Sequence, residues 1–424
     1  RAQSRDPTSP PPAEPQPAPG NRNTLFELPF QPTPFIGRTS ELSEIARILP
    51  DPGCRLLTLF GPSGIGKTRL ALEAAARHTE RFADGVAFVA LSSVATPSQL
   101  VSAIGQAINL SLSGQLSSER EPVAELLDAL RSRHMLLVLD DFGHLLDSVD
   151  LVYDLLHTAG RITILVTSQV RLNLQAEWLF DVAGLAYPPE ETTIGVNATD
   201  YSAVQLFVQR ATQVQRGFSP SDSALASIVR ICQYVAGMPL AIELAAANVR
   251  LLSIGEIERQ IRLNLDVLTT TARDVPARHR SLRAVFDHAW NLLNDAEQAV
   301  LSRLAIYRGG WAQAAEKAIC AQVTGRAGAG KQAEGAWPFL EHTVSPALLA
   351  SLLDKSLVRR DTSEIRVREH SSINSLANRE AEPRFILLEP IREYALEQLV
   401  ARGEAAGLQR AHAPYYLSLA ETAA

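Results

Sequence analysis

Four short apolar runs in the first half of the chain predict the strands of a parallel sheet. The runs cover residues 56–60, 86–91, 135–139 and 162–167. Segments with helical spacing lie between them, and another precedes them at Leu42, Ile45, Ala46 and Leu49, where Pro50 ends the pattern. Near-continuous apolar strands that alternate with helices are typical of a sheet that is buried on both faces. This half of the chain therefore predicts an α/β fold.

Beyond about residue 195, helical patterns replace the strand patterns. They predict helices over 202–214, 223–234 and 239–250, and a further helix after the capping-box sequence Ser253-Ile-Gly-Glu256. Residues 281–320 also show helical spacing. A helix over 346–354, a hairpin-like strand pair over 356–360 and 384–388, and a helix over 390–402 follow. Helices followed by a hairpin and a closing helix favour a winged-helix domain.

Residues 61–68 read GPSGIGKT and match the phosphate-binding pattern GxxxxGK[ST] between a strand and an Ala-rich helix. The glycines let backbone N–H groups surround a phosphate, and the N-terminus of the following helix adds positive charge. Lys67 is expected to reach the β and γ phosphates as a catalytic residue, and Thr68 to bind Mg²⁺. A second match at 325–331 lacks both the strand and the hydroxyl residue, so it is not expected to bind phosphate. The expected phosphate-binding residues are Gly61, Pro62, Ser63, Gly64, Ile65, Gly66, Lys67, Thr68 and Arg69.

Two carboxylates follow the third apolar run, where ligands of open α/β sheets bind. We expect Asp140 to hold Mg²⁺ together with Thr68. Asp141 is positioned to polarise an attacking water as a general base, so it joins Lys67 as a catalytic candidate. For Asp141 the alternative of a solvated strand end stays open.

Composition and charge argue against nucleic acid and membranes as partners, and against disulfides or a zinc site. The 46 acidic residues exceed the 40 basic ones, and the net charge of -6 gives no overall attraction to nucleic acid or anionic lipid. Cys54, Cys232 and Cys320 form no CxxC pair, which argues against a disulfide framework or a zinc site. The sequence holds no apolar run of about 18 residues that would predict a membrane span. We therefore expect a cytoplasmic protein without a membrane partner.

Six motifs in order resemble the STAND class of signalling ATPases, relatives of the NB-ARC and AAA+ proteins. The likeness is closest to large bacterial LuxR-type transcriptional regulators of the AfsR and MalT-like kind, and it covers residues 32–424. The motifs are PTPFIGRTSEL, GPSGIGKTRLALEAA, LLVLDDFGHLLD, ILVTSQVRLNLQAEWLF, ICQYVAGMPLAIELAAA, and LLDKSLVRR followed by RFILLEPIREYALEQL.

The resemblance implies ATP or ADP with Mg²⁺ as the ligand. In such proteins the residues at Phe35, Ile36, Gly37 and Arg38 line the adenine and ribose, and the proline at Pro239 lies against the base. Pro239 also suits the first position of a helix after a glycine turn, and the two roles are compatible.

Two positions depart from the family pattern. Relatives carry an arginine after Thr-Ser at the end of the fourth strand, where this chain has Gln169. An amide can bind phosphate but cannot offset its charge, so we expect slow hydrolysis unless another cation substitutes. Arg171 is one candidate for that cation, with a surface role as its alternative. The second departure is Leu387-Leu388-Glu389 at the Met-His-Asp position, which removes a histidine contact to ADP.

These observations predict a P-loop NTPase domain with a parallel sheet, followed by an all-helical domain and a winged-helix domain. Because the chain begins at Arg1 rather than at a methionine, we also expect an upstream domain before it. The expected division is a disordered Pro-rich linker over 1–34, the nucleotide-binding domain over 35–195, the helical domain over 196–275, the winged-helix domain over 276–402 with insertions at 321–345 and 361–382, and the start of a C-terminal helical region, with a tetratricopeptide array as one candidate, over 403–424.

The expected function is a signalling switch that is closed around ADP and opened by ATP together with an inducer, which the sequence does not identify. The ATP-bound form is expected to self-associate and to regulate transcription. A continuously hydrolysing AAA-type remodelling ATPase and a structural scaffold with a vestigial site are the alternatives.

Direct nucleic-acid binding by the winged-helix segment is not expected, because acidic residues interrupt its basic ones. A domain outside this chain would supply that binding. The basic residues in question are Arg278, Arg280, Arg283, Lys355, Arg359, Arg360, Arg366 and Arg368.

Overall fold

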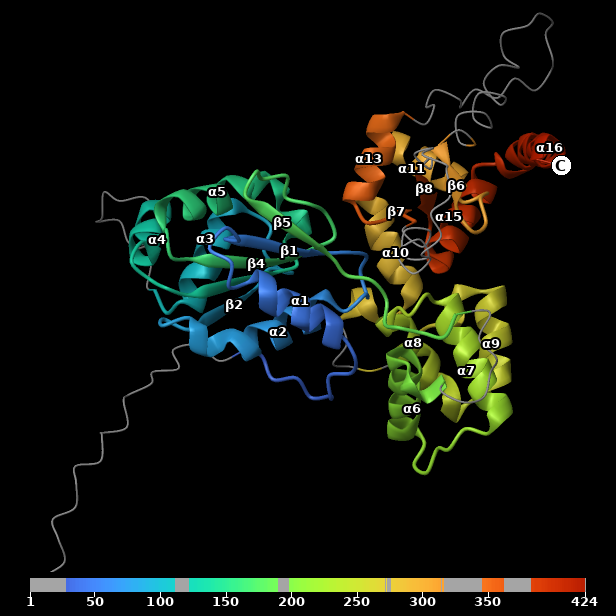
Figure 1. The fold of residues 1–424 in the computed structure, drawn as a ribbon, viewed down its shortest axis with the longest axis horizontal. Helices are drawn as coiled ribbons and strands as arrows, with labels where there is room; N and C mark the ends of the chain where they lie inside the picture. The colour runs from blue at the N-terminus through green and yellow to red at the C-terminus, as the bar shows by residue number, and fades with distance from the viewer. Residues whose placement is uncertain are drawn as a thin grey trace, which may run out of the picture.

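The structure is a computed structural model in which three folded parts and a C-terminal helix are described. Figure 1 shows a sheet domain on one side and two smaller parts, one above the other, beside it. The predicted linker 1–34 and the insertions 321–345 and 361–382 lie almost entirely outside the described residues. The structure describes residues 28–110, 122–189, 198–270, 272, 276–313, 315, 345–361 and 383–423.

The sheet domain contains a parallel sheet whose described strands run in the order β2-β3-β4-β1-β5. The four apolar runs are confirmed as strands to within one residue at each end. The fifth strand is absent from the sequence prediction. It lies at the edge of the sheet and leaves Trp178 and Leu179 partly exposed, so it lacks a continuous apolar run. The strands are β1 (Leu56–Phe60), β2 (Val86–Ala90), β3 (Leu136–Asp140), β4 (Thr163–Ser168) and β5 (Glu177–Asp181).

Helices pack on both faces of this sheet, because successive side chains of a strand point to opposite sides. Leu57 and Leu59 of β1 share one hydrophobic core with α1 and α2. Leu137 of β3 and Ile164 of β4 share a second core with α3, α4 and α5. The helices are α1 (Thr39–Ile48), α2 (Lys67–His78), α3 (Pro97–Ala107), α4 (Pro122–Leu130) and α5 (Val149–Thr158).

The next part of the chain is helical, as the sequence predicts. Serines cap two of its helices: the side chain of Ser221 accepts a hydrogen bond from the backbone of Ala224, and that of Ser253 accepts one from the backbone of Glu256. The third predicted helix ends as an α-helix at Ala247 and continues as the short 3₁₀ helix η5 (Asn248–Arg250). The α-helices are α6 (Ser202–Val214), α7 (Asp222–Tyr234), α8 (Pro239–Ala247) and α9 (Ile254–Leu263).

The third part, which we call the C-terminal module, combines helices with a small antiparallel sheet in the order β6-β8-β7. The pairing of β7 with β8 confirms the predicted hairpin-like strands, whereas β6 is absent from the sequence prediction. The name winged helix remains a prediction, because most of 361–382, the expected wing, is not described. The elements are α10 (Leu282–Asn291), α11 (Asp295–Leu304), β6 (Trp311–Ala312), α13 (Pro346–Asp354), β7 (Arg359–Arg360), β8 (Arg384–Ile386) and α15 (Glu389–Ala401).

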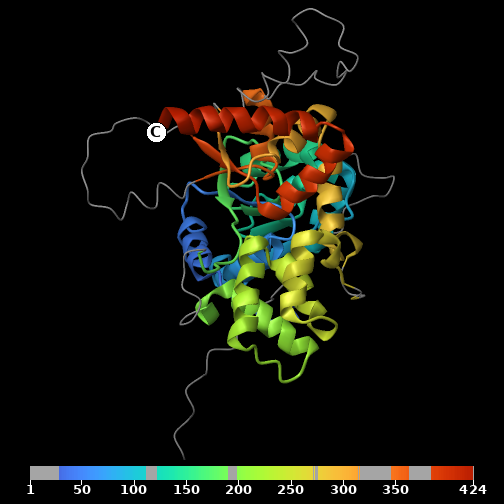
Figure 2. The same cartoon turned by 90° about the vertical axis from the view of Figure 1, so that its right-hand side faces the viewer.

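The C-terminal helix α16 (Ala405–Ala423) follows the module and runs along its outer side (Figure 2). Within the described ranges, no helix has both the length and the apolar character that crossing a membrane requires.

Polar contacts join the C-terminal module to the sheet domain. Arg171 contacts Asp354 at the end of α13, with 3.0 Å between Nη1 and Oδ1. Arg359 of β7 contacts Asp181 of β5 at 3.1 Å. Arg171 therefore does not act as a phosphate cation in this arrangement. Because β4 ends at Ser168, the chain does not stay extended as far as Arg171, and the side chain turns toward α13.

Candidate functional site

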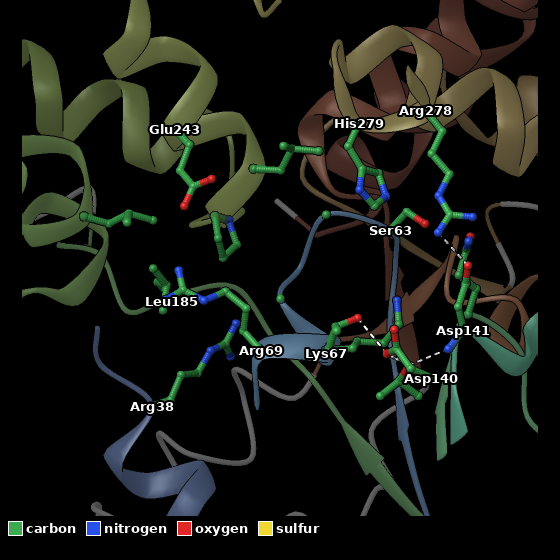
Figure 3. A pocket seen from close by; sticks show the side chains of 18 of the residues that line it. Arg38, Ser63, Lys67, Arg69, Asp140, Asp141, Leu185, Glu243, Arg278 and His279 are labelled. Atoms are coloured by element: carbon green, nitrogen blue, oxygen red, sulfur yellow. Dashed lines mark hydrogen bonds and ion pairs between the residues drawn. The ribbon is translucent and has the colours of Figure 1, made fainter. Parts of the chain in front are cut away.

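The sheet domain, the helical part and the C-terminal module all line one cavity of about 260 Å³. Figure 3 shows side chains from all three parts around it. The lining residues from the sheet domain are Phe35, Ile36, Arg38, Ser63, Gly64, Gly66, Lys67, Thr68, Arg69, Asp140, Asp141, Thr167, Gln169 and Leu185. Those from the other two parts are Leu206, Pro239, Leu240, Glu243, Arg278, His279 and His288.

The glycine-rich loop between β1 and α2 forms the floor of the cavity. Lys67, the first residue of α2, is buried, and its Nζ donates hydrogen bonds to the carbonyls of Gly61 at 2.8 Å and Pro62 at 3.1 Å. Burial lowers the pKa of Lys67 to about 8, although Asp141 and Asp140 act in the opposite direction. Gly64 has a φ of 79°, and a Cβ there would lie 3.0 Å from the side chain of Leu240. The loop conformation therefore depends on glycine and packs directly against α8.

A hydrogen-bonded cluster holds the first carboxylate at the end of β3. Oδ1 of Asp140 accepts hydrogen bonds from Thr68 at 2.7 Å and from Thr167 at 2.6 Å. Burial raises the pKa of Asp140, and the two hydroxyls counteract this only in part. Thr167 also accepts a hydrogen bond from the backbone N–H of Asp141. The predicted metal pair, Thr68 and Asp140, is thus brought together, with Thr167 as a third member.

The second carboxylate lies beside the first but has a different partner. Asp141 adopts a φ of 67°, a left-handed conformation that is uncommon outside glycine. Its Oδ2 lies 2.9 Å from Nη2 of Arg278 in the C-terminal module. The proposed general base is therefore in an ion pair across the cavity.

The N-terminal segment before α1 forms a second wall. Phe35 and Ile36, the expected adenine and ribose contacts, line the cavity. The guanidinium of Arg38 donates hydrogen bonds to the carbonyls of Ala183 at 2.7 Å and Ile65 at 2.8 Å. It therefore links the N-terminal segment to the glycine-rich loop and to the segment that follows β5. Arg69 donates to the carbonyls of Thr33 and Pro34, and its guanidinium carbon lies 6.0 Å from the ring centroid of Phe35.

Four predicted ligand residues do not line the cavity. Gly37 has a φ of 69° and lies so close to α6 that a Cβ would be 2.5 Å from Ser202, so its role is close packing. Ile65 is fully buried in the core below the loop. Gly61 and Pro62 contribute the carbonyls that accept from Lys67.

The helical part closes the cavity with the N-terminal turn of α8. Pro239 occupies the first helical turn and lines the cavity, which is compatible with both predicted roles. The backbone N–H of Leu240 donates to the carbonyl of Gly64 at 3.2 Å. Glu243, four residues after Pro239, lies on the same helix face and accepts hydrogen bonds from Arg210. Glu243 is absent from the sequence prediction, although that spacing is a signal that would have found it.

The C-terminal module contributes three cavity-lining residues that the sequence analysis did not predict as site residues. Arg278 and His279 lie on the 3₁₀ helix η7 (Ala277–His279), and His288 lies on α10. The sequence groups Arg278 with basic residues that would suit nucleic-acid phosphates, but the structure places it in the cavity. Burial lowers the pKa of His279, and neighbouring Arg278 lowers it further, which favours a neutral imidazole.

Other basic residues of that group are paired with acidic residues in the structure. Arg283 contacts Asp266 and Glu397, and Lys355 contacts Glu297. The pairs of Arg283 with Glu397 and of Lys355 with Glu297 lie within the C-terminal module, whereas the pair of Arg283 with Asp266 joins the module to the helical part. Arg366 and Arg368 lie outside the described residues.

Comparisons with known proteins place this site in a family. The model of a protein family described as an AAA domain matches residues 51–172 of this chain. A "Putative HTH-type transcriptional regulator" of Mycobacterium tuberculosis is 34% identical over 373 residues, which cover 86% of this chain and 36% of that protein. The chain thus spans well under half the length of this relative. A crystal structure of a STAND protein with a tetratricopeptide repeat sensor, from Pyrococcus horikoshii, is 18% identical with a TM-score of 0.33, covering 91% of this chain and 45% of that one.

A second relative matches over most of its length. This uncharacterized protein of Mycobacterium tuberculosis is 31% identical over 374 residues, which cover 88% of this chain and 83% of that protein. The shared region includes the AAA domain with the glycine-rich loop described above. The chain therefore belongs to the same family of P-loop NTPases with an AAA domain as these mycobacterial proteins.

Proposed function

We propose that this chain is a nucleotide-dependent signalling switch that binds ATP or ADP with Mg²⁺ in the cavity. In this proposal the nucleotide state controls how the sheet domain, the helical part and the C-terminal module are arranged. The STAND-like division into 35–195, 196–275 and 276–402 is part of the same proposal. An inducer of unknown chemistry would act together with ATP, and the opened form would self-associate.

One observation carries this proposal: all three parts of the chain line the same cavity. A ligand bound there would touch the glycine-rich loop, the start of α8 and the η7 segment at once. Ligands shift the populations of conformations only through differences in binding free energy between them. A nucleotide that fits one arrangement of the three parts better than another therefore selects that arrangement.

The donor set fits a magnesium–nucleotide complex. Thr68 and Asp140 present hard oxygen atoms within hydrogen-bond distance of each other, and Mg²⁺ commonly uses one or two protein oxygens while it keeps several waters. The half-buried carboxylate of Asp140, whose pKa is raised by partial desolvation, would be stabilised by a cation. Mg²⁺ would neutralise phosphate charge when bound. Lys67, at the N-terminus of α2, would orient the phosphates.

We propose that hydrolysis is slow. Gln169, which is buried and lines the cavity, brings no positive charge to the end of β4. Asp141, the general-base candidate, is held by Arg278 in this arrangement. A carboxylate that is engaged by a guanidinium is poorly placed to accept a proton from water.

We further propose that the switch works within a cytoplasmic transcription regulator. The support is the name of the mycobacterial relative, of which this chain spans 36%. DNA binding would belong to a part of such a protein outside this chain.

The test is calorimetric titration of the purified chain with MgADP and with Mg²⁺ and a non-hydrolysable ATP analogue. We expect both to bind, and we expect Lys67→Ala to weaken both by about tenfold or more, because it removes a charge-assisted contact to phosphate. Lys331→Ala, in the second GxxxxGK match, is the matched control and should change nothing.

Small-angle scattering of the same complexes tests the switch itself. We expect the ADP and ATP-analogue complexes to differ in radius of gyration or in assembly state. Binding without any such difference would favour a scaffold with a residual site. Steady phosphate release faster than roughly one per second, a rate typical of working enzymes, would favour a remodelling ATPase.

A further inference from the structure

Arg278 differs from the other cations of the cavity in what it contacts. Lys67 and Arg69 donate to backbone carbonyls, and Arg38 donates to two carbonyls and to the neighbouring Glu41. Arg278 instead reaches across the cavity from η7 to the carboxylate of Asp141, at 2.9 Å. Figure 3 shows it descending toward Asp141 on the side of the cavity that holds Lys67 and Asp140.

On this side of the cavity the sheet domain supplies Lys67 but no second cation at the end of β4. Asp140 and Asp141 line the cavity beside Lys67, so the third phosphate of a nucleotide held by the glycine-rich loop, as proposed above, would lie near two carboxylates. Gln169 at the end of β4 is neutral. A terminal phosphate would add negative charge next to both carboxylates, which is unfavourable unless a positive group offsets it.

The Arg278 side chain has the chemistry and the freedom to act as that group. Its planar guanidinium matches the oxygen atoms of a phosphate as well as those of a carboxylate. Arg278 and Asp141 retain 34% and 27% side-chain exposure respectively, so their ion pair faces the cavity and is not sealed in the core. A phosphate that enters the cavity can therefore compete with Asp141 for the guanidinium.

We propose that Arg278 recognises the terminal phosphate of a bound nucleoside triphosphate, exchanging Asp141 for it. This inference rests on the proposed function of the cavity as a nucleotide site. A diphosphate leaves the Arg278–Asp141 ion pair intact, and the η7 segment stays tied to β3. A triphosphate breaks the pair, frees Asp141 and gives η7 and α10 a new partner. Arg278 thereby supplies the cation that position 169 lacks.

The test compares two variants that each remove one ion pair between the sheet domain and the C-terminal module. Arg278→Ala removes the pair inside the cavity. Arg171→Ala removes the pair with Asp354, which has a similar distance of 3.0 Å and side-chain exposures of 39% and 31%, but Arg171 does not line the cavity. The measured quantity is the ratio of the affinity for a non-hydrolysable ATP analogue to that for ADP, by calorimetry with Mg²⁺.

We expect Arg278→Ala to lower this ratio by about tenfold, because losing a hydrogen bond to a charged group has an effect of that size. Arg171→Ala should leave the ratio within about twofold of the wild type, as expected for an exposed ion pair away from the ligand. An unchanged ratio in folded Arg278→Ala overturns the inference, and so does an equal fall in both variants. If Arg278→Ala does not fold, Arg278→Gln keeps a polar side chain with a shorter stem and no charge, and it is judged by the same two results.

The wild-type titration separates this inference from the proposed function. A wild-type chain that binds neither nucleotide overturns both. Wild-type binding of both nucleotides with no dependence on Arg278 overturns only the role assigned to that residue.

Discussion

At the residue scale, neighbouring hydroxyl groups hold the carboxylate of Asp140 in place. This carboxylate is half-buried, and hydroxyls from two separate elements, Thr68 on α2 and Thr167 on β4, donate to the same oxygen. Groups that hold a metal-binding carboxylate in place typically change metal affinity by about 10- to 100-fold when they are removed. We therefore propose that Thr167 positions Asp140 for the proposed Mg²⁺ site.

We predict that Thr167→Val weakens the Mg²⁺ dependence of nucleotide binding by roughly tenfold. The substitution keeps the side-chain shape but removes the hydrogen bond to Asp140 and the acceptor for the Asp141 N–H. The measurement is a Mg²⁺ titration of nucleotide affinity. Thr163→Val, at the opposite end of β4, is the control and should behave like the wild type. Equal Mg²⁺ dependence in both variants would rule out the positioning role.

At the scale of elements, helix ends carry local sequence signals that the edge strand β5 and the short strands of the C-terminal module lack. Ser221, Ser253, Ser281 and Ser345 each cap the helix that follows them, and Asn294 begins a complete capping box. These contacts span three residues, so the sequence alone contains them. β5 has no comparable signal, because its pairing with β1 joins segments far apart in the chain. The two-residue strands of the C-terminal module likewise depend on long-range partners.

The capping box of α11 has a tertiary role that leads to a pH-dependent prediction. Burial alone would raise the pKa of Glu297, but hydrogen bonds from Lys355 and Ser351 outweigh it and hold the pKa below its ordinary value. A carboxyl group with a lowered folded-state pKa contributes stability above its unfolded pKa. That contribution is lost as the pH falls through the folded value.

We predict that Glu297→Gln lowers the free energy of unfolding at pH 7 by about 1 to 3 kcal/mol, because Lys355 loses its charged partner. The variant should also lose less stability than the wild type between pH 5 and pH 3, since its side chain does not titrate. Denaturant unfolding across this pH range measures both effects. Parallel pH profiles for the two proteins would contradict the prediction.

At the scale of the whole molecule, the C-terminal module is attached to the sheet domain around the cavity. Ser356 donates a hydrogen bond to the carbonyl of Gln169, a cavity-lining residue, at 2.9 Å. Arg359 donates to the carbonyl of Val182 at 2.8 Å and pairs with Asp181. The module thus contacts the ends of β4 and β5 directly, and a shift at the phosphate side of the cavity would reach it without intermediate elements.

We predict that Arg359→Ala loosens this attachment. It removes a half-buried guanidinium that bridges the carbonyl of Val182 and the carboxylate of Asp181, so the module should separate more readily and the radius of gyration should rise. Arg384→Ala is the control, because the carboxylate that it contacts among the described residues, that of Asp361 at 4.0 Å, belongs to the module itself. Small-angle scattering of the ligand-free proteins measures the change. A rise of the same size in both variants would indicate a general loss of stability instead.

The sequence by itself determined the glycine-rich loop, the carboxylates at the end of β3 and the order of the main helices and buried strands. Each of these depends on residues that are close together in the chain, so the local pattern contains the necessary information. Only the tertiary structure decided that Arg171 points to α13 and that Arg278 enters the cavity. Both contacts join residues more than 130 positions apart, and their partners are set by how the three parts pack, which no local pattern encodes.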